Sequence, residues 1–192
     1  MTKTRLEAFS DAVIAIILTI MVLELKPIPP ATWHDLGELR HIFFSYLVSF
    51  VMLGIYWGNH HHLIHTIKDV RGGIIWANLH LLFWLSLIPF ATAWMGENHF
   101  EKKTVAFYAL IANLCGVAYY ILLVIMKKCN PGNEKLLDLL RKQSRKGTIS
   151  CILYTIAMGT AFIHEAIGGA LIIMVAIMWL IPDRNIERSL HD

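Results

Sequence analysis

The chain has 192 residues, of which 56% are hydrophobic and only 16% are charged, and its formal net charge is +3. A typical soluble domain carries about 25% charged residues, so the composition excludes an ordinary soluble globular protein. Several apolar runs approach the ~20 residues that a helix needs to cross a bilayer. We therefore expect an all-α integral membrane protein. The three scattered cysteines predict neither a disulfide framework nor a zinc site, and we expect no nucleic acid partner.

Six hydrophobic segments predict six transmembrane helices in a single domain that covers residues 1–192. Helices are expected because long apolar runs within lipid must satisfy their backbone hydrogen bonds internally. We find no internal repeat, and the last two segments are so close together that they predict a tight helical hairpin. The expected spans cover residues 5–25, 40–66, 74–95, 104–126, 147–163 and 166–181.

The first segment opens with RLEAFSDAVIAI, which carries Arg5, Ser10 and Asp11 toward the membrane although charge at that depth is unfavourable. Asp11 interrupts the apolar run, so we interpret the segment as a retained helix rather than a cleavable signal peptide. At about 100° per residue, Ser10 and Asp11 fall away from a largely apolar stripe. This stripe contains Arg5, Phe9, Ala12, Ile16, Thr19, Ile20 and Leu23. Periodicity alone leaves two interpretations open: a helix-packing face or a hydrophobic constriction in a pore.

The second segment ends in a histidine-rich stretch, YWGNHHHLIH, at residues 56–65. His61 and His65 are four residues apart and share a helix face, a spacing that suits zinc or haem, but a closed site needs more ligands. His80 is a candidate further ligand. We favour the alternative that Asn59, His60 and His61 form hydrogen bonds with neighbouring helices, since such bonds commonly join membrane bundles. Ser10 and Asp11, at a similar depth, are candidate partners.

Basic residues predict the orientation of the chain. With both termini in the cytoplasm, thirteen of the 17 Lys and Arg residues lie on the inner side, and this agrees with the positive-inside rule. The remaining four are Lys26, Arg40, Lys102 and Lys103. The stretch 127–146 is strongly basic, and we expect a cytoplasmic connector there. The alternative is a short helix on the inner leaflet, capped by Asn133, with an apolar face that contains Leu136, Leu137, Leu139 and Leu140.

Arg5, Phe9, Ser10 and Asp11 form an RxxxFSD motif that is followed by AVIAIILTIMVLEL. This stretch resembles the opening helix of the transmembrane protein 175 family, whose animal members are endosomal and lysosomal potassium channels. YWGNHH at 56–61 and LSLIPFATAWMGE at 85–97 also match the family. The last three segments match it only in pattern.

The resemblance implies a potassium-preferring cation channel, not an enzyme, that assembles as a homotetramer in the plasma membrane of a prokaryote. It also implies contact with membrane lipid, K⁺ as the permeant ion and no cofactor. The sequence contains no TVGYG filter. The first helix lines the pore in this family. The implied pore residues are Ile16, Thr19, Ile20 and Leu23, and all four lie on the apolar stripe. The implied residues that brace this helix against its neighbours are Arg5, Phe9, Ser10, Asp11, Trp57, His60, His61 and Asn78.

Two other functional classes remain open. A haem- or metal-binding membrane protein would use the His60–His65 cluster and His80. A proton-coupled transporter would use Asp11 and the histidines, but the broken mid-membrane helices typical of such proteins are represented only by Pro89. The position of Arg5 is also open, because the helical wheel places it on the pore side and the resemblance places it among the bracing residues.

Overall fold

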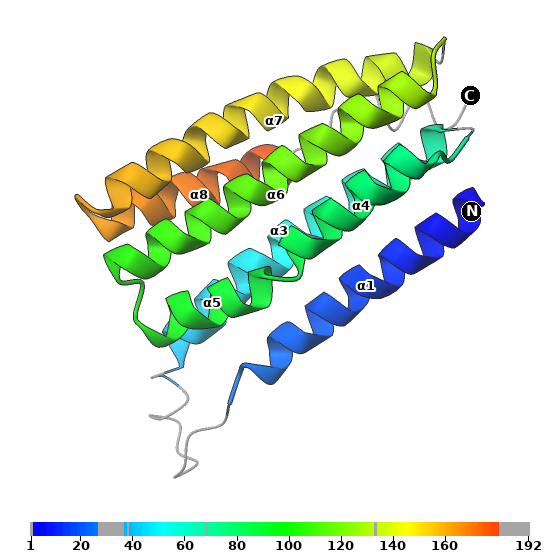
Figure 1. Ribbon diagram of the computed structural model, residues 1–192. Helices are drawn as coiled ribbons and strands as arrows, with labels where there is room; N and C mark the ends of the chain where they lie inside the picture. The colour runs from blue at the N-terminus through cyan, green and yellow to red at the C-terminus, as the bar shows by residue number, and fades with distance from the viewer. Residues whose placement is uncertain (1, 27–36, 38, 68, 133, 181–192) are drawn as a thin grey trace.

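The computed structural model describes residues 2–26, 37, 39–67, 69–132 and 134–180, and the regular structure in these residues is entirely helical (Figure 1). The all-α prediction is therefore confirmed. The helices are α1 (Lys3–Leu23), α3 (Arg40–Thr66), α4 (Gly72–Leu85), α5 (Ile88–Glu97), α6 (Lys102–Cys129), α7 (Glu134–Ala161) and α8 (Glu165–Leu180). Because α4 and α5 follow one another within one apolar segment, the described helices form the six predicted segments.

The third segment differs from the continuous helix that we expected, because a turn at Ser86 and Leu87 separates α4 from α5. Pro89 accounts for the turn. It has no N–H to donate to the carbonyl of Leu85, and its ring would collide with that carbonyl in a continuous helix. At the turn, Ser86 Oγ donates a 2.7 Å hydrogen bond to the carbonyl of Phe83.

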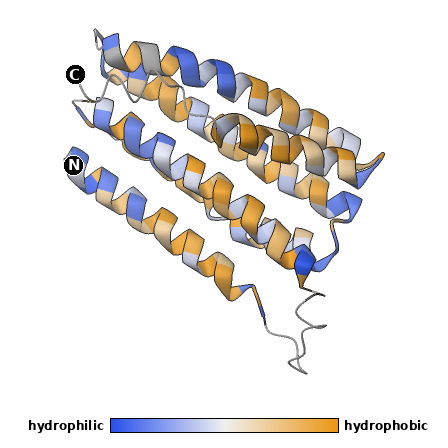
Figure 2. Cartoon of the chain, turned by 180° about the vertical axis from the view of Figure 1, so that it is seen from behind, coloured by the Kyte–Doolittle hydropathy of each residue, from blue (hydrophilic) through white to orange (hydrophobic). Residues whose placement is uncertain are grey.

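The fifth segment is longer than predicted, since α7 runs without interruption for 28 residues from Glu134 to Ala161. A short separate helix before residue 147 was therefore the wrong expectation, whereas the cytoplasmic side of this stretch stays a prediction, and Asn133 lies outside the described residues. Leu136, Leu140 and Tyr154 are buried along one face of α7, so packing continues through its polar first half. The helix is ~42 Å long, which exceeds the ~30 Å hydrocarbon core. Figure 2 shows the polar half at one end of the molecule.

Four stretches of the described chain are long and apolar enough to cross a membrane: α1, α3, α4 together with α5, and α6. The apolar helix α8 is shorter. With these spans, the protein is a multi-pass membrane protein.

The helix ends gather at two ends of the molecule (Figure 1). At one end, Lys3 Nζ donates a 2.8 Å hydrogen bond to the carbonyl of His65, and Asp69 N donates a 3.3 Å bond to Asn130 Oδ1. At the other end, Lys102 Nζ donates a 3.1 Å bond to the carbonyl of Ile163. Neighbouring segments are therefore antiparallel. Helix α1 lies at the edge of the bundle, where its main contacts are with α3, α4 and α5.

Candidate pore helix and its anchoring site

Helix α1 has one buried face and one exposed face, and the predicted pore residues lie on the exposed face. Ile16 and Leu23 are 55% and 71% exposed in the single chain, and Thr19 and Ile20 are also exposed. Hence the apolar stripe does not pack against the rest of the chain. The buried face, with successive spacings of three or four residues, contains Leu6, Ser10, Ile14, Ile17 and Met21.

Three buried polar side chains join α1 to α3 and α4. Asn78 Nδ2 donates a 2.9 Å hydrogen bond to Ser10 Oγ, and His60 Nε2 lies 2.7 Å from Asn78 Oδ1. The amide oxygen can only accept, so His60 is the donor in this pair. Ser10 Oγ in turn donates a 2.8 Å bond to the carbonyl of Leu6. Ser10, His60 and Asn78 are almost completely buried. Each has a hydrogen-bond partner among the other two, in surroundings that offer little water.

Asp11 makes a separate contact with α3, close to this buried chain of hydrogen bonds. Trp57 Nε1 donates a 3.0 Å hydrogen bond to Asp11 Oδ1. The Trp57 ring stacks on His61, with ring centroids 5.9 Å apart and an angle of 29° between the planes. The carboxylate of Asp11 thus has a partner that accounts for its presence in an apolar helix.

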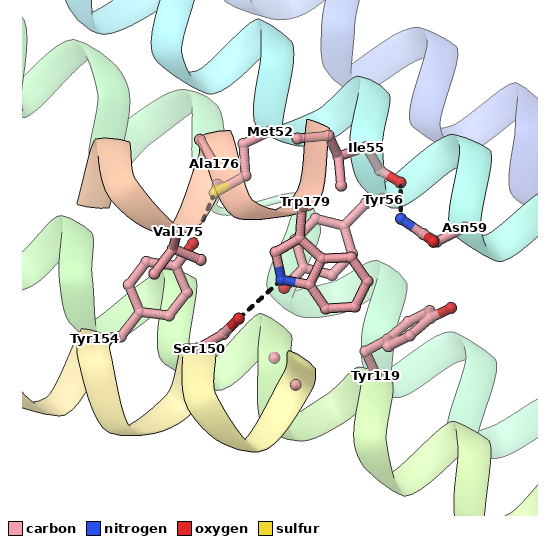
Figure 3. A pocket seen from close by; sticks show the side chains of 12 residues that line it. Met52, Ile55, Tyr56, Asn59, Tyr119, Ser150, Tyr154, Val175, Ala176 and Trp179 are labelled. Carbon is pink, nitrogen blue, oxygen red and sulfur yellow. Dashed lines mark hydrogen bonds between the residues drawn. The ribbon is translucent and has the colours of Figure 1, made fainter. Parts of the chain in front are cut away.

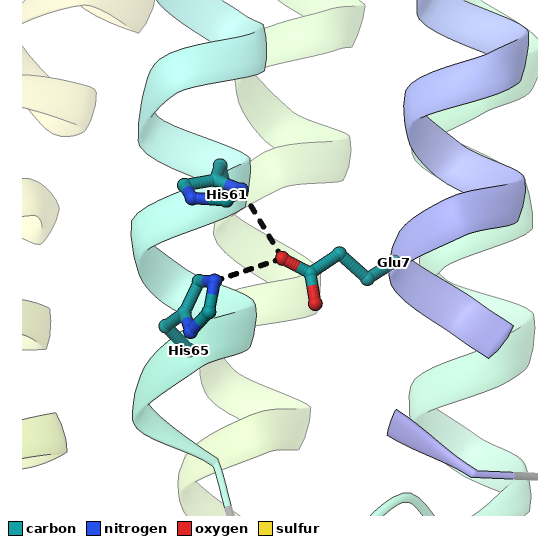
Figure 4. Close-up of side chains that lie close together, drawn as sticks. All are labelled: Glu7, His61 and His65. Atoms are coloured by element: carbon teal, nitrogen blue, oxygen red, sulfur yellow. Dashed lines mark ion pairs between the residues drawn. The ribbon is translucent and has the colours of Figure 1, made fainter. Parts of the chain in front are cut away.

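Glu7 is the contact residue that the sequence analysis missed. Its Oε1 atom lies 3.1 Å from His61 Nδ1 and 2.9 Å from His65 Nε2 (Figure 4). A sequence signal for it exists, because Lys3, Glu7 and Asp11 follow one another at intervals of four residues and so share the helix face that approaches α3. We define the anchoring site as Glu7, Ser10, Asp11, Trp57, His60, His61, His65 and Asn78.

Three residues singled out in the sequence lie outside the anchoring site. Arg5 and Phe9 are exposed on the pore-stripe side of α1, so a bracing role for them stays a prediction. His80 accepts a 2.9 Å hydrogen bond from Trp84 Nε1 on its own helix. Among the described residues, the group of ligand atoms close enough to share a metal ion contains Glu7, His61 and His65 but not His80.

Two hollows lie near these elements. A groove of about 440 Å³ separates the outer half of α1 from the α4–α5 turn, and Ile16 and Ile20 contribute to its wall together with Pro89 and Phe90. A smaller cavity of about 40 Å³ lies among α3, α6, α7 and α8, where Trp179 donates a 2.8 Å hydrogen bond to Ser150 (Figure 3). It has room for one or two water molecules, and none of the predicted site residues lines it.

Comparison with known proteins agrees with this architecture. Residues 5–89, which include α3, α4, nearly all of α1 and the whole anchoring site, match the family model described as endosomal/lysosomal potassium channel TMEM175. A protein of Chryseobacterium sp. (strain P1-3), named a potassium channel, is 47% identical over 192 residues, which cover all of both chains. The chain belongs to the TMEM175 family. The family predicted from the RxxxFSD motif is thereby confirmed.

Two further proteins are similar over shorter or more divergent alignments. A protein of Streptomyces collinus, named a potassium channel, is 34% identical over 119 residues, which cover 59% of this chain and 57% of the relative. The crystal structure of a lysosomal potassium-selective channel TMEM175 homolog from Chamaesiphon minutus superposes with a TM-score of 0.81. It is 24% identical and covers 93% of this chain and 96% of its own, so the two proteins share a fold.

Proposed function

We propose that four copies of the chain assemble into a potassium-preferring cation channel in the cell membrane of a prokaryote, with α1 of each copy lining the pore. The observation that carries this proposal is the exposed apolar face of α1, on the opposite side of the helix from the anchored face. The potassium channels among the relatives, one of which matches over the full length, support it.

The proposed barrier to ions is apolar. Ile16, Ile20 and Leu23 from four copies would form successive hydrophobic rings, and a narrow ring of this kind stops ions by excluding water. Thr19 contributes the only hydroxyl group on this stretch of the stripe, and its Oγ1 donates a 2.8 Å hydrogen bond to the carbonyl of Ile16. The two oxygen lone pairs are then left for ions or water. Without a filter of backbone carbonyls, the preference for K⁺ over Na⁺ is modest.

The proposed topology has six spans with both termini in the cytoplasm. The distribution of basic side chains supports it. Lys3, Arg71, Lys127 and Lys128 belong to the end of the bundle at which α1 begins, whereas Lys102 belongs to the opposite end. An excess of Lys and Arg marks the cytoplasmic side of a membrane protein, so the first of these two ends is the inner one.

A flux measurement tests the channel. Purified protein in liposomes with an outward K⁺ gradient is expected to release K⁺ faster than empty vesicles, and faster than it releases Na⁺ from an equal gradient. Flux no greater than that of empty vesicles, from protein that elutes as a single species, would overturn the proposal. Equal rates for the two ions would overturn the selectivity alone.

The tetramer is tested separately by mass. Each chain has a mass of 21.9 kDa, and light scattering with correction for bound detergent is expected to give four chains per particle. A particle of one or two chains would contradict the assembly, whatever the flux experiment shows.

A further inference from the structure

Glu7 contacts two histidines, whereas a simple ion pair needs only one basic partner for a carboxylate. It brings together one carboxylate from α1 and two imidazoles from successive turns of α3 (Figure 4). We propose that Glu7, His61 and His65 form a binding site for a divalent transition-metal ion, Zn²⁺ in particular, which fastens the inner end of α1 to α3.

The distances suit such an ion. One ligand atom from each residue lies within 4.8 Å of the others, and Glu7 Oε1 lies 3.1 Å and 2.9 Å from the two nitrogens. Zinc holds nitrogen and oxygen ligands at about 2.0–2.2 Å in a tetrahedron, which places neighbouring ligand atoms ~3.4 Å apart. Small rotations of the two imidazole rings therefore bring all three atoms to bonding distance.

The donor set also fits the chemistry. Two imidazoles with one carboxylate are ligands that zinc accepts, and a fourth position is left for water. His61 Nδ1 is buried and has no partner of hydrogen-bonding geometry among the described residues, although Glu7 Oε1 is close to it. A metal ion would satisfy this nitrogen. The side chain of His65 is 52% exposed and that of Glu7 is 17% exposed, so the site is open to water on one side.

The local charge favours a cation. Asp11 lies one helical turn from Glu7, and Lys3 lies one turn on its other side with its ammonium group bonded to the carbonyl of His65. With neutral histidines these three ionised side chains add up to one negative charge. Metal binds the neutral form of imidazole, so protons compete with the ion for these two ligands.

Direct titration tests the site. The protein is purified without a polyhistidine tag, stripped with a chelator and titrated with Zn²⁺ by calorimetry and with Co²⁺ by visible absorption. We expect one ion per chain and a higher unfolding temperature in the presence of zinc, since the ion binds only the folded protein. Absence of saturable binding, or binding without thermal stabilisation, would overturn the proposal.

Variants then locate the site. Glu7→Gln and His65→Asn are each expected to weaken zinc binding at least ~tenfold, because even the residues that hydrogen-bond metal ligands cost ~10–100-fold when they are changed. The matched control is His164→Asn, which removes another exposed histidine that lies beside a carboxylate, 3.9 Å from Glu165 Oε1. It should bind zinc as the parent does. If Glu7→Gln does not fold, the zinc affinity of His65→Asn alone tests the site. Unchanged affinity in that variant, or an equal loss in the control, would refute the assignment.

Discussion

Asn78 Nδ2 donates a 2.9 Å hydrogen bond to Ser10 Oγ, and this contact lies on the face of α1 that is turned toward the bundle. Within lipid, the hydrophobic effect does little to set the rotation of a helix, because lipid tails are as apolar as its own aliphatic side chains. A buried polar pair can set it, since rotation would leave both groups without partners. Ser10 lies on the buried face with Ile14 and Ile17, so Ile16 and Ile20 face outward.

Replacing Asn78 by alanine is expected to destabilise the protein by about 1–3 kcal/mol, because His60 Nε2 loses its partner in a buried place. The free energy of unfolding in mixed detergent micelles measures the effect. Asn98→Ala is the control, since among the described residues Asn98 Nδ2 bonds the carbonyl of Trp94 in the helix that it caps, and no other helix. Its expected change lies within about 0.5 kcal/mol. Equal losses of unfolding free energy in the two variants would show that the buried hydrogen bonds of Asn78 stabilise the protein no more than the local bond of Asn98 does.

Ile16→Asn is expected to increase K⁺ flux or to reduce selectivity, because a polar side chain makes a narrow apolar ring easier to wet. Potassium release from liposomes measures the change. The control is Ile177→Asn, which makes the same substitution on α8 at a side chain of similar exposure, 53% against 55%. It should leave flux at the parent rate. If Ile16→Asn also does so, the ring is not the barrier.

Thr19→Val keeps the shape of the side chain and removes its hydroxyl group. We expect the K⁺/Na⁺ permeability ratio to fall about two- to tenfold, which corresponds to one hydrogen bond of ~0.5–1.5 kcal/mol. Reversal potentials in planar bilayers with K⁺ on one side and Na⁺ on the other measure this ratio. Thr19→Ser retains the oxygen and should keep the ratio. A ratio unchanged in Thr19→Val would remove Thr19 from the selectivity mechanism.

The α7–α8 hairpin depends on the small size of Gly168. A Cβ atom there would lie 2.9 Å from Ala161 Cβ, 3.0 Å from the Ala157 carbonyl oxygen and 3.1 Å from Val105 Cγ1. Gly168→Ala is therefore expected to destabilise the protein by about 1–3 kcal/mol. Gly169→Ala is the matched control, because a Cβ at that position meets nothing within 4 Å. Thermal unfolding of both variants in the same detergent compares them, and equal melting temperatures would contradict the close approach.

The sequence predicted the helices and the two faces of α1 because both follow from local periodicity. Ser10 and Ile16 differ in direction on any straight helix, whatever its neighbours are. By contrast, the Glu7 contact joins residues that are 54 and 58 positions apart in the chain. It depends on how far α1 and α3 are shifted relative to each other along their axes. No periodicity within one segment contains that information.

The extent of α7 was missed for a different reason. Hydropathy marks where a chain enters lipid, not where a helix begins, and residues 134–146 are too polar to be assigned to a span. They nevertheless continue the helix, because Leu136 and Leu140 bury the same face that Tyr154 buries farther along. The break before α5 has a sequence signal in Pro89, but a proline alone does not distinguish a turn from a kink.

In the part of the chain that the structure describes, the polar contacts between α1 and other helices run from Lys3 to Asp11. Beyond Asp11, the helix is flanked by the groove in front of the α4–α5 turn. The polar contacts therefore hold the inner end of α1, whereas the outer part is held by the buried apolar side chains of Ile14, Ile17 and Met21. The part of α1 from Asp11 to Leu23 is ~18 Å long, so a tilt of about 5° about Asp11 would displace Leu23 by ~1.6 Å. Ile16 lies nearer to Asp11 and would move less than half as far as Leu23.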